Sequence, residues 1–415
     1  MTDRSNKDDG MKDSALNPQR RLALQGAAAA ASWLALPSGF CAAPVQAQAQ
    51  AQPRATLKVG PKREIRSLSA ASREAKDGML IEVDAGDYLG DVALWSQNGI
   101  TLKAVGGRVV LRAAGMSMQN KGIFVTTGRD ISIEGFDFFG AVVPDQNGAG
   151  IRLEAGSLKL RDCSFKDNEN GVLTSNDNSV RLEVENCEFG TIVRHQGKNH
   201  NIYVGAIAYF RAEGCYFHHG QAGHLLKSRA AINHIFYNRL TDEIGGQSSY
   251  ELEFPNGGQC LVVGNVIAQS ATSENPHMIS FGAEGYTWPR QELHLINNTV
   301  VDGRPSGGIF LRVSPAQGAA QVKVRLFNNL WVGNPKLPEQ ADWQQGGNLA
   351  VDYDVFVQAN RDNYLLKPGA KVRGKAVDPG EVDGLSLRPV AQFLAPRGTL
   401  KLTAPASHPG AFQFP

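Results

Sequence analysis

Titratable side chains gather densely between residues 195 and 253 of the sequence. Six of the nine histidines lie between His195 and His234, and lysine, arginine and glutamate side chains share the same stretch. Imidazole, amine and carboxylate groups can exchange protons when their surroundings shift their pKa values. The stretch could therefore carry out acid–base chemistry, or it could form a polar patch without a reaction. Which of these two alternatives holds depends on whether the strands and turns of the stretch bring the side chains together on one face.

Strand alternation predicts which of these side chains share a face. Successive side chains of a β-strand point to opposite faces, so in the segment YELEF (residues 250–254) both glutamates should face outward. In HLLKSR (residues 224–229), the cost of burying charge predicts an outward lysine and arginine. Coils stacked at about 4.8 Å would bring such residues into one outer groove. The side chains expected there are Asn201, Tyr203, Lys227, Arg229, Glu251, Glu253, Ser280 and Arg312.

The histidines fall in turns at the margin of this expected groove. His195, His200 and His224 are candidate contacts for a bound molecule, together with Asn201, Tyr203 and Arg312. The histidine spacing matches no zinc motif such as HExxH, whereas carboxylate oxygens suit a hard cation. The metal that we consider is therefore Ca²⁺, with Glu251, Glu253 and Asp242 as candidate ligands, and the sequence does not establish that the site holds a metal.

A repeat surrounds the stretch and predicts how its strands are arranged. Short alternating strands, polar turns and small-residue corners recur, as in KGIFVTTGRDISIEGFDFFG and NGVLTSNDNSVRLEVENCEFG. Such a period, with only short strands inside it, predicts a solenoid in which equivalent positions stack into ladders. Cysteines 163, 187 and 215 should form one ladder of buried thiols without an essential disulfide. Asparagines 238, 265, 298 and 329 should form a second. The corners align at Asp162, Asn186, Gly214, Tyr237, Gly264, Asn297 and Asn328.

The repeat resembles the right-handed parallel β-helix proteins of the pectate-lyase-like superfamily. The resemblance covers residues 57–331 and the ending PGAFQ (residues 409–413). It implies an all-β, single-stranded, right-handed parallel β-helix over residues 52–332. A short amphipathic helix around Leu68, Ala71 and Ala75 should cap its first coil, because an open sheet end would expose unpaired backbone groups. Residues 333–415 should form a loop-rich C-terminal cap.

Within this superfamily, the segment LLKSRAAINHIFYNRL (residues 225–240) is similar to the alginate lyase and chondroitinase B type of polysaccharide lyase. In that family a lysine at the position matching Lys227 is the Brønsted base. One coil later the family has an Arg-His pair, where this chain has Glu251 and Glu253. The resemblance implies β-elimination on an acidic polysaccharide or oligosaccharide. The departure leaves the substrate and the reaction open.

Three functions are compatible with the expected groove. In a lyase, Lys227 would remove the C5 proton of a uronate, Arg229 with Arg312 or Ca²⁺ would neutralise its carboxylate, and Tyr203, His200 or His224 would protonate the leaving oxygen. In a glycoside hydrolase, Glu251 and Glu253 would be the pair of carboxylates. The third alternative is a noncatalytic carbohydrate-binding or surface-scaffold protein.

Charge and targeting signals bear on partners and location. The formal net charge is +2 over 415 residues, which gives no basic surface of the kind that binds nucleic acid. Arg20 and Arg21 precede an apolar run over residues 22–36, which predicts an export signal over residues 1–51, either twin-arginine or ordinary secretory. No later segment is long enough to span a membrane. We expect a periplasmic or secreted monomer.

Overall fold

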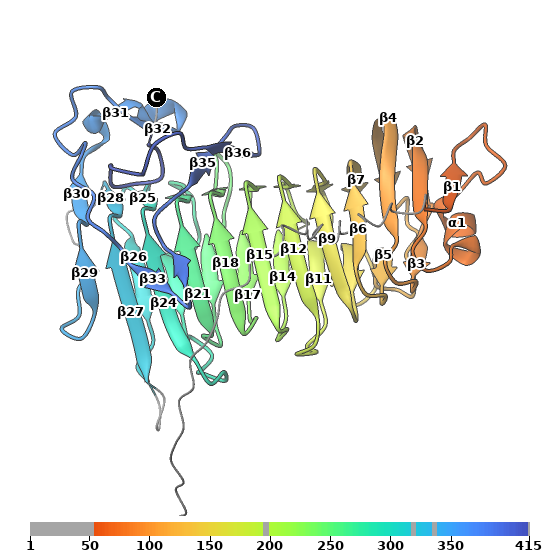
Figure 1. Cartoon of the computed structure of the whole chain (residues 1–415), viewed down its shortest axis with the longest axis horizontal. Helices are drawn as coiled ribbons and strands as arrows, with labels where there is room; N and C mark the ends of the chain where they lie inside the picture. Colours follow the sequence, from red (N-terminus) through yellow and green to blue (C-terminus); the bar gives the residue numbers. More distant parts are fainter. Residues whose placement is uncertain (1–53, 194–198, 317–320, 334–337, 414–415) are drawn as a thin grey trace, which may run out of the picture. The chain divides into compact units, whose positions relative to one another are not determined.

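The computed structural model describes residues 54–193, 199–316, 321–333 and 338–413. These residues form a parallel β-solenoid of stacked coils (Figure 1), in agreement with the expected fold class. The expected export signal and His195 lie outside the described residues. No helix in the described ranges is long and apolar enough to cross a membrane.

Two parallel sheets make up the walls of the solenoid. In the described part of the chain, the smaller sheet has nine strands, and it carries the predicted site residues Tyr203, Lys227, Glu253 and Arg312. Its strands, in spatial order, are β26 (Ile309–Val313), β23 (His277–Phe281), β20 (Leu252–Phe254), β17 (Leu226–Ser228), β14 (Ile202–Val204), β11 (Asn170–Thr174), β8 (Ala149–Leu153), β5 (Gly122–Thr126) and β3 (Ala93–Trp95).

The larger sheet bends at the corners, so most coils contribute two strands to it. Its strands are β1 (Thr56–Val59), β2 (Leu80–Leu89), β4 (Thr101–Arg112), β6 (Ile131–Glu134), β7 (Phe136–Phe139), β9 (Ser157–Arg161), β10 (Ser164–Lys166), β12 (Arg181–Glu185), β13 (Glu188–Phe189), β15 (Tyr209–Glu213), β16 (Tyr216–Phe217), β18 (Ile232–Phe236), β19 (Arg239–Thr241), β21 (Gln259–Val263), β22 (Val266–Gln269), β24 (Gln291–Ile296), β25 (Thr299–Asp302), β27 (Val322–Phe327), β28 (Leu330–Val332), β29 (Gln344–Gly346) and β30 (Leu349–Val351). Strand pairing therefore continues past Trp331, where the repeat in the sequence fades.

The corners lie where the repeat predicts them. All seven aligned corner residues have a positive φ, between 50° and 68°, from Asp162 (φ 50°) to Gly264 (φ 68°). This left-handed conformation favours Gly, Asn and Asp, and six of the seven corners use one of these residues. The exception is Tyr237, whose hydroxyl accepts a hydrogen bond from the backbone N–H of Val390 in the C-terminal segment.

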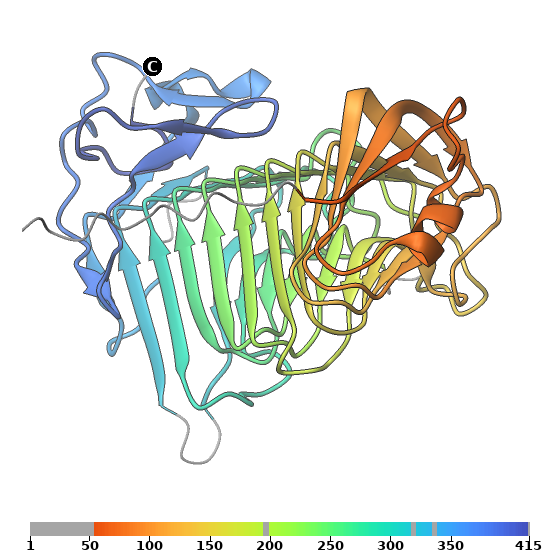
Figure 2. The ribbon, with the colours of Figure 1, turned by 45° about the vertical axis from the view of Figure 1, so that its right-hand side comes forward.

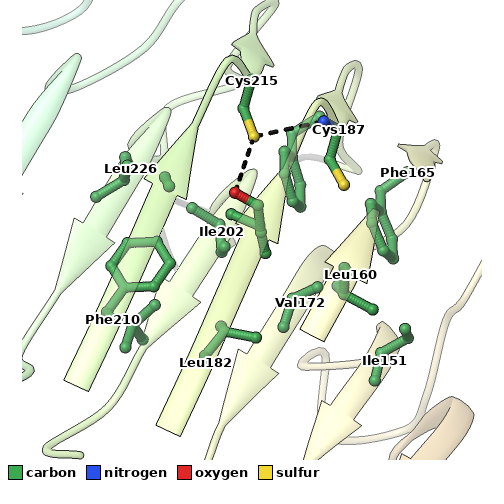
Figure 3. Packing of buried hydrophobic residues seen from close by; sticks show 14 of the residues in the cluster. Ile151, Leu160, Phe165, Val172, Leu182, Cys187, Ile202, Phe210, Cys215 and Leu226 are labelled. Atoms are coloured by element: carbon green, nitrogen blue, oxygen red, sulfur yellow. Dashed lines mark hydrogen bonds between the residues drawn. The ribbon is translucent and has the colours of Figure 1, made fainter. Parts of the chain in front are cut away.

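Side-chain ladders fill the interior beside the corners. Phe138, Phe165, Phe189 and Phe217 stack in sequence with ring centroids 4.8 to 4.9 Å apart. The predicted asparagine ladder is confirmed: Asn238, Asn265, Asn298 and Asn329 each donate Nδ2 to the next side chain at 3.0 Å, and Asn348 adds a further rung. The cysteine ladder lies in the same interior (Figure 3), where the Cys215 Sγ accepts the backbone N–H of Cys187.

Both ends of the solenoid carry added elements. Helix α1 (Leu68–Glu74) confirms the predicted N-terminal helix, and its N-cap Ser67 accepts a hydrogen bond from the backbone N–H of Ala70. The residues after the last coil form η1 (Tyr353–Val355), η2 (Ala359–Arg361) and the antiparallel strand pairs β31 (Phe356–Gln358) with β32 (Asn363–Leu366), β33 (Glu381–Val382) with β34 (Leu385–Ser386), and β35 (Ala391–Phe393) with β36 (Thr399–Lys401). The turn between β35 and β36 reaches back to the middle coils, where the backbone N–H of Gly398 donates to the backbone oxygen of Gly214. Figure 2 shows this C-terminal segment, in dark blue, beside the later coils.

Candidate functional site

Strand register aligns five side chains on the outer face of the nine-stranded sheet. The Cα partners run from Tyr203 on β14 through Lys227 on β17, Glu253 on β20 and Ser280 on β23 to Arg312 on β26. We call these five residues the outer row. Their neighbours on the inner face, Ile202, Leu226, Leu252 and Ile279, are fully buried in the core. The predicted alternation is therefore confirmed for these strands.

Lys227 is the second residue of the outer row and lies between two carboxylates. Its Nζ is 3.2 Å from Oε2 of Glu253 and 3.1 Å from Oε1 of Glu284. The lysine side chain is only 11% exposed, so both contacts are partly shielded from water. The two carboxylates stabilise the positive charge of Lys227.

Arg229 links Tyr203 to Glu284. Its Nη1 donates to the Tyr203 hydroxyl at 2.5 Å, and its Nη2 donates to both carboxylate oxygens of Glu284 at 2.8 and 2.6 Å. The Arg229 guanidinium also lies 5.1 Å from the centre of the Tyr203 ring, within the range of a cation–π contact. Tyr203, Lys227, Arg229, Glu253 and Glu284 thus form one connected group, which we call the central cluster.

The sequence interpretation missed Glu284. This residue lies in the loop of residues 282–290, which joins β23 to β24 and folds back toward β17. The Trp288 Nε1 donates to the backbone oxygen of Arg229 at 2.9 Å, and the Tyr286 hydroxyl donates to the backbone oxygen of Ser314 at 2.6 Å. The coil that contains the loop is longer than the coils before it, and this extra length was the available signal of an insertion.

His200 and His224 lie beneath the central cluster. The backbone N–H of His224 donates to Nδ1 of His200 at 2.9 Å, and Nδ1 of His224 lies 3.0 Å from Oε2 of Glu253. Burial lowers the pKa of both histidines, although Glu253 opposes the effect on His224. His224 therefore contacts Glu253 directly, whereas His200 contacts the backbone of His224.

The expectation that Glu251 faces outward beside Glu253 is wrong. β20 begins at Leu252, so Glu251 belongs to the preceding turn, where alternation no longer applies. It is fully buried and accepts a hydrogen bond from the Ser248 hydroxyl at 2.9 Å. Burial and the Asp242 carboxylate raise the pKa of Glu251 well above its ordinary value. For Glu253, burial favours a higher pKa, but His224 and Lys227 outweigh it and the pKa is lowered.

The Asn201 side chain does not reach the outer face, whereas the Arg312 side chain does. Asn201 was expected in the groove, but it is fully buried in a turn, where its Nδ2 donates to the backbone oxygens of Phe189 and His218 at 2.9 and 2.8 Å. Buried backbone oxygens in a turn need hydrogen-bond donors, and the Asn201 side chain points inward to supply them. Arg312 is exposed as predicted, but β23 separates its strand from Glu253 and the central cluster.

The carboxylates do not assemble a metal site. Within the described residues, no group of three or more His, Cys, Asp or Glu side chains could hold a metal ion. The oxygens of Asp242 instead accept hydrogen bonds from the backbone N–H groups of Gly220 and Ser248, and Glu253 contacts a lysine and a histidine. These residues do not fit the calcium site considered from the sequence.

The stacked parallel coils and short capping helix define the chain as a parallel β-helix protein. Among solved structures, it is similar to pectate lyase Pel9A, with a TM-score of 0.58 and 15% identity over 87% of this chain and 97% of the other. A PL6 family polysaccharide lyase from Pseudopedobacter saltans, Pedsa3628, gives a TM-score of 0.37 and 13% identity over 80% of this chain and 99% of the other. No protein-family model and no curated protein matches the sequence. At 15% identity, the likeness to pectate lyase Pel9A supports the fold alone.

Proposed function

We propose that the chain is a polysaccharide lyase that cleaves a uronate-containing polysaccharide by β-elimination at the central cluster. The observation that carries this proposal is the position of Lys227, with Arg229 and Tyr203 joined by a hydrogen bond beside it on one outer face. A base, a carboxylate-binding cation and a proton donor are the three groups that β-elimination from a uronate requires. The pectate-lyase-like fold is consistent with this chemistry.

The proposed reaction assigns one role to each of three side chains. Lys227 accepts the C5 proton of the uronate after it has lost its own proton, because the charged form that pairs with Glu253 and Glu284 cannot act as a base. Arg229 pairs with the uronate carboxylate and stabilises the negative charge that develops there. The electrons of the C5–H bond form the C4–C5 double bond, the C4–O bond breaks, and the Tyr203 hydroxyl protonates the departing oxygen.

The experiment that tests the function is incubation with a panel of acidic and neutral polysaccharides. Ultraviolet absorbance detects the double bond of a lyase product, and a reducing-sugar assay detects any cleavage. Absorbance together with new reducing ends supports a lyase. Reducing ends without absorbance would show that the protein is a hydrolase. The absence of both signals would show that it is a noncatalytic binder.

The hydrolase alternative needs a different pair of carboxylates from the pair that the sequence suggested. Glu251 is fully buried and contacts Ser248, whereas Glu253 contacts Lys227. Glu253 and Glu284 instead flank Lys227 from two sides. If the chain were a hydrolase, its two carboxylates would therefore be Glu253 and Glu284.

We also propose that the protein is exported to the periplasm or the medium and is a monomer.

A further inference from the structure

Two cations of the central cluster share a carboxylate that belongs to the chain itself. Glu284 accepts from Nη2 of Arg229 through both oxygens, at 2.8 and 2.6 Å, and from Nζ of Lys227 at 3.1 Å. Arginine and lysine side chains around one carboxylate are the groups with which proteins bind acidic ligands. Glu284 thus occupies the position that the carboxylate of a ligand would take.

The setting of Glu284 differs from that of Glu253. The Glu253 side chain is 5% exposed and lies on a strand, whereas the Glu284 side chain is 44% exposed and lies in the loop of residues 282–290. Gly282 and Gly285 flank it with φ values of 78° and 94°, which other residues rarely adopt. A ligand carboxylate in the place of Glu284 would restore the ion pairs that Lys227 and Arg229 lose. Replacing the contacts of Glu284 with those of a ligand carboxylate would therefore cost the fold little, whereas removing Glu253 would uncover a buried charge.

We propose that Arg229, with Lys227 beside it, forms a carboxylate-binding site that Glu284 occupies in the free protein, and that acidic saccharides bind by displacing Glu284. The loop of residues 282–290 then makes the site selective, because only a ligand with its own carboxylate can replace the contacts that Glu284 gives up. A neutral sugar offers no charge to Arg229 and leaves Glu284 in place. This inference rests on the proposed function for the class of its ligand, an acidic saccharide.

The surroundings of Arg229 leave room for the rest of such a ligand. Trp288, which donates to the backbone oxygen of Arg229, also borders an open hollow of about 660 Å³. Asn176, Asn178 and Asn256 line the same hollow together with Asp177. Amide groups can hydrogen-bond to sugar hydroxyls, and an indole can pack against an apolar sugar face. Asp177 would repel a second carboxylate, so the unit that enters the hollow should be uncharged.

Glu284→Gln tests the proposal, because it keeps the size of the side chain and removes its charge. We would measure the binding of glucuronate and galacturonate, with glucose and galactose as neutral counterparts, by isothermal titration calorimetry. The matched control is Glu185→Gln on β12, since Glu185 also pairs with one lysine and one arginine, at 2.6 and 3.0 Å, but on the larger sheet. Circular dichroism would confirm that each variant keeps its fold, and Glu284→Ala provides a second variant.

Removing an internal competitor raises the apparent affinity by the inverse of the fraction of free sites. We expect Glu284→Gln to bind at least one uronate on the order of tenfold more tightly than the wild type. The uronate affinity of Glu185→Gln should equal that of the wild type, and neither variant should bind neutral sugars more tightly. Adding Arg229→Gln to Glu284→Gln should remove the gain. Unchanged, weaker or undetectable uronate binding in both Glu284 variants would overturn the proposal.

The binding result and the activity result are independent. A gain in uronate affinity without any unsaturated product from the polysaccharide panel would leave the carboxylate site standing and overturn the lyase function. Unsaturated product from the wild type, with no gain in affinity in the Glu284 variants, would support the lyase function and overturn the displacement of Glu284. In that second case Glu284 would be a positioning residue for Lys227 and Arg229.

Discussion

Glu251 and Glu253 are separated by one residue, yet their pKa values are shifted in opposite directions. Glu251 is buried against Ser248 and close to Asp242, so its pKa is raised well above the ordinary value. Glu253 is also buried, but Lys227 at 3.2 Å and His224 at 3.0 Å lower its pKa. The same residue type therefore serves as a neutral acid in a turn and as a charged partner on the outer face.

This difference predicts opposite effects of pH on stability. Because the folded-state pKa of Glu251 is raised, its stabilising contribution is complete below the unfolded-state pKa and is lost as the pH rises through the folded-state value. Glu251→Gln should therefore match the wild type in acid and become the more stable of the two as the pH rises. Urea unfolding at a series of pH values measures the difference.

Glu253→Gln provides the comparison of opposite sign. Its lowered pKa gives a contribution that is present above the unfolded-state pKa and is lost as the pH falls through the folded-state value. We expect Glu253→Gln to be less stable than the wild type at neutral pH by roughly 1.5–3 kcal/mol, the size of a charged hydrogen bond, and the deficit to shrink in acid. A constant deficit at every pH would contradict the assignment of charge to Glu253.

Lys227→Ala tests the proposed base. Loss of general-base catalysis typically costs about 10²- to 10⁴-fold in rate, so formation of unsaturated product should fall by that amount while the circular dichroism spectrum is retained. Lys159→Ala is the control, because Lys159 also pairs with glutamates but lies on β9 of the larger sheet. A Lys227→Ala variant with wild-type turnover would rule out this lysine as the base.

Asn265→Ala tests the asparagine ladder. The Asn265 Oδ1 accepts the backbone N–H of Asn238 at 2.8 Å, and its Nδ2 donates to the backbone oxygen of Ile235 at 2.8 Å. The substitution leaves both buried groups without their partner, which should lower the free energy of unfolding by roughly 3 kcal/mol. The exposed Asn178→Ala should change it by less than about 0.5 kcal/mol. Equal urea midpoints for the two variants would mean that the ladder contributes no stability.

The buried thiols should be unreactive in the folded protein. Cys163, Cys187, Cys215 and Cys260 are free and buried, and burial raises the pKa of Cys163, Cys187 and Cys260. Thiol reagents attack the thiolate, so alkylation of these residues should be slow in buffer and complete in urea, as followed by peptide mass spectrometry. Rapid labelling of Cys187 under native conditions would contradict the packed interior.

The sequence by itself determined the coils, their corners and most of their inward faces. Gly, Asn and Asp recur at the corners because the left-handed conformation favours them, and the aligned asparagines stack because each amide can both donate and accept. The alternation that predicted an outward Tyr203 and Lys227 is a local property of extended chains. These signals need only neighbouring residues or a regular period, so they are visible without coordinates.

Tertiary structure alone decided where each strand begins and what the loops contact. Alternation failed for Asn201 and Glu251 because β14 begins at Ile202 and β20 at Leu252, so both residues precede their strands. The Glu251 side chain then turns inward to Ser248, and the Asn201 side chain turns inward to the backbone of Phe189 and His218. Glu284 reaches Lys227 across 57 residues of sequence, and no local pattern specifies such a contact. Strand periodicity fixes the direction of a side chain, whereas the group that it contacts depends on how the loops fold back over the coils.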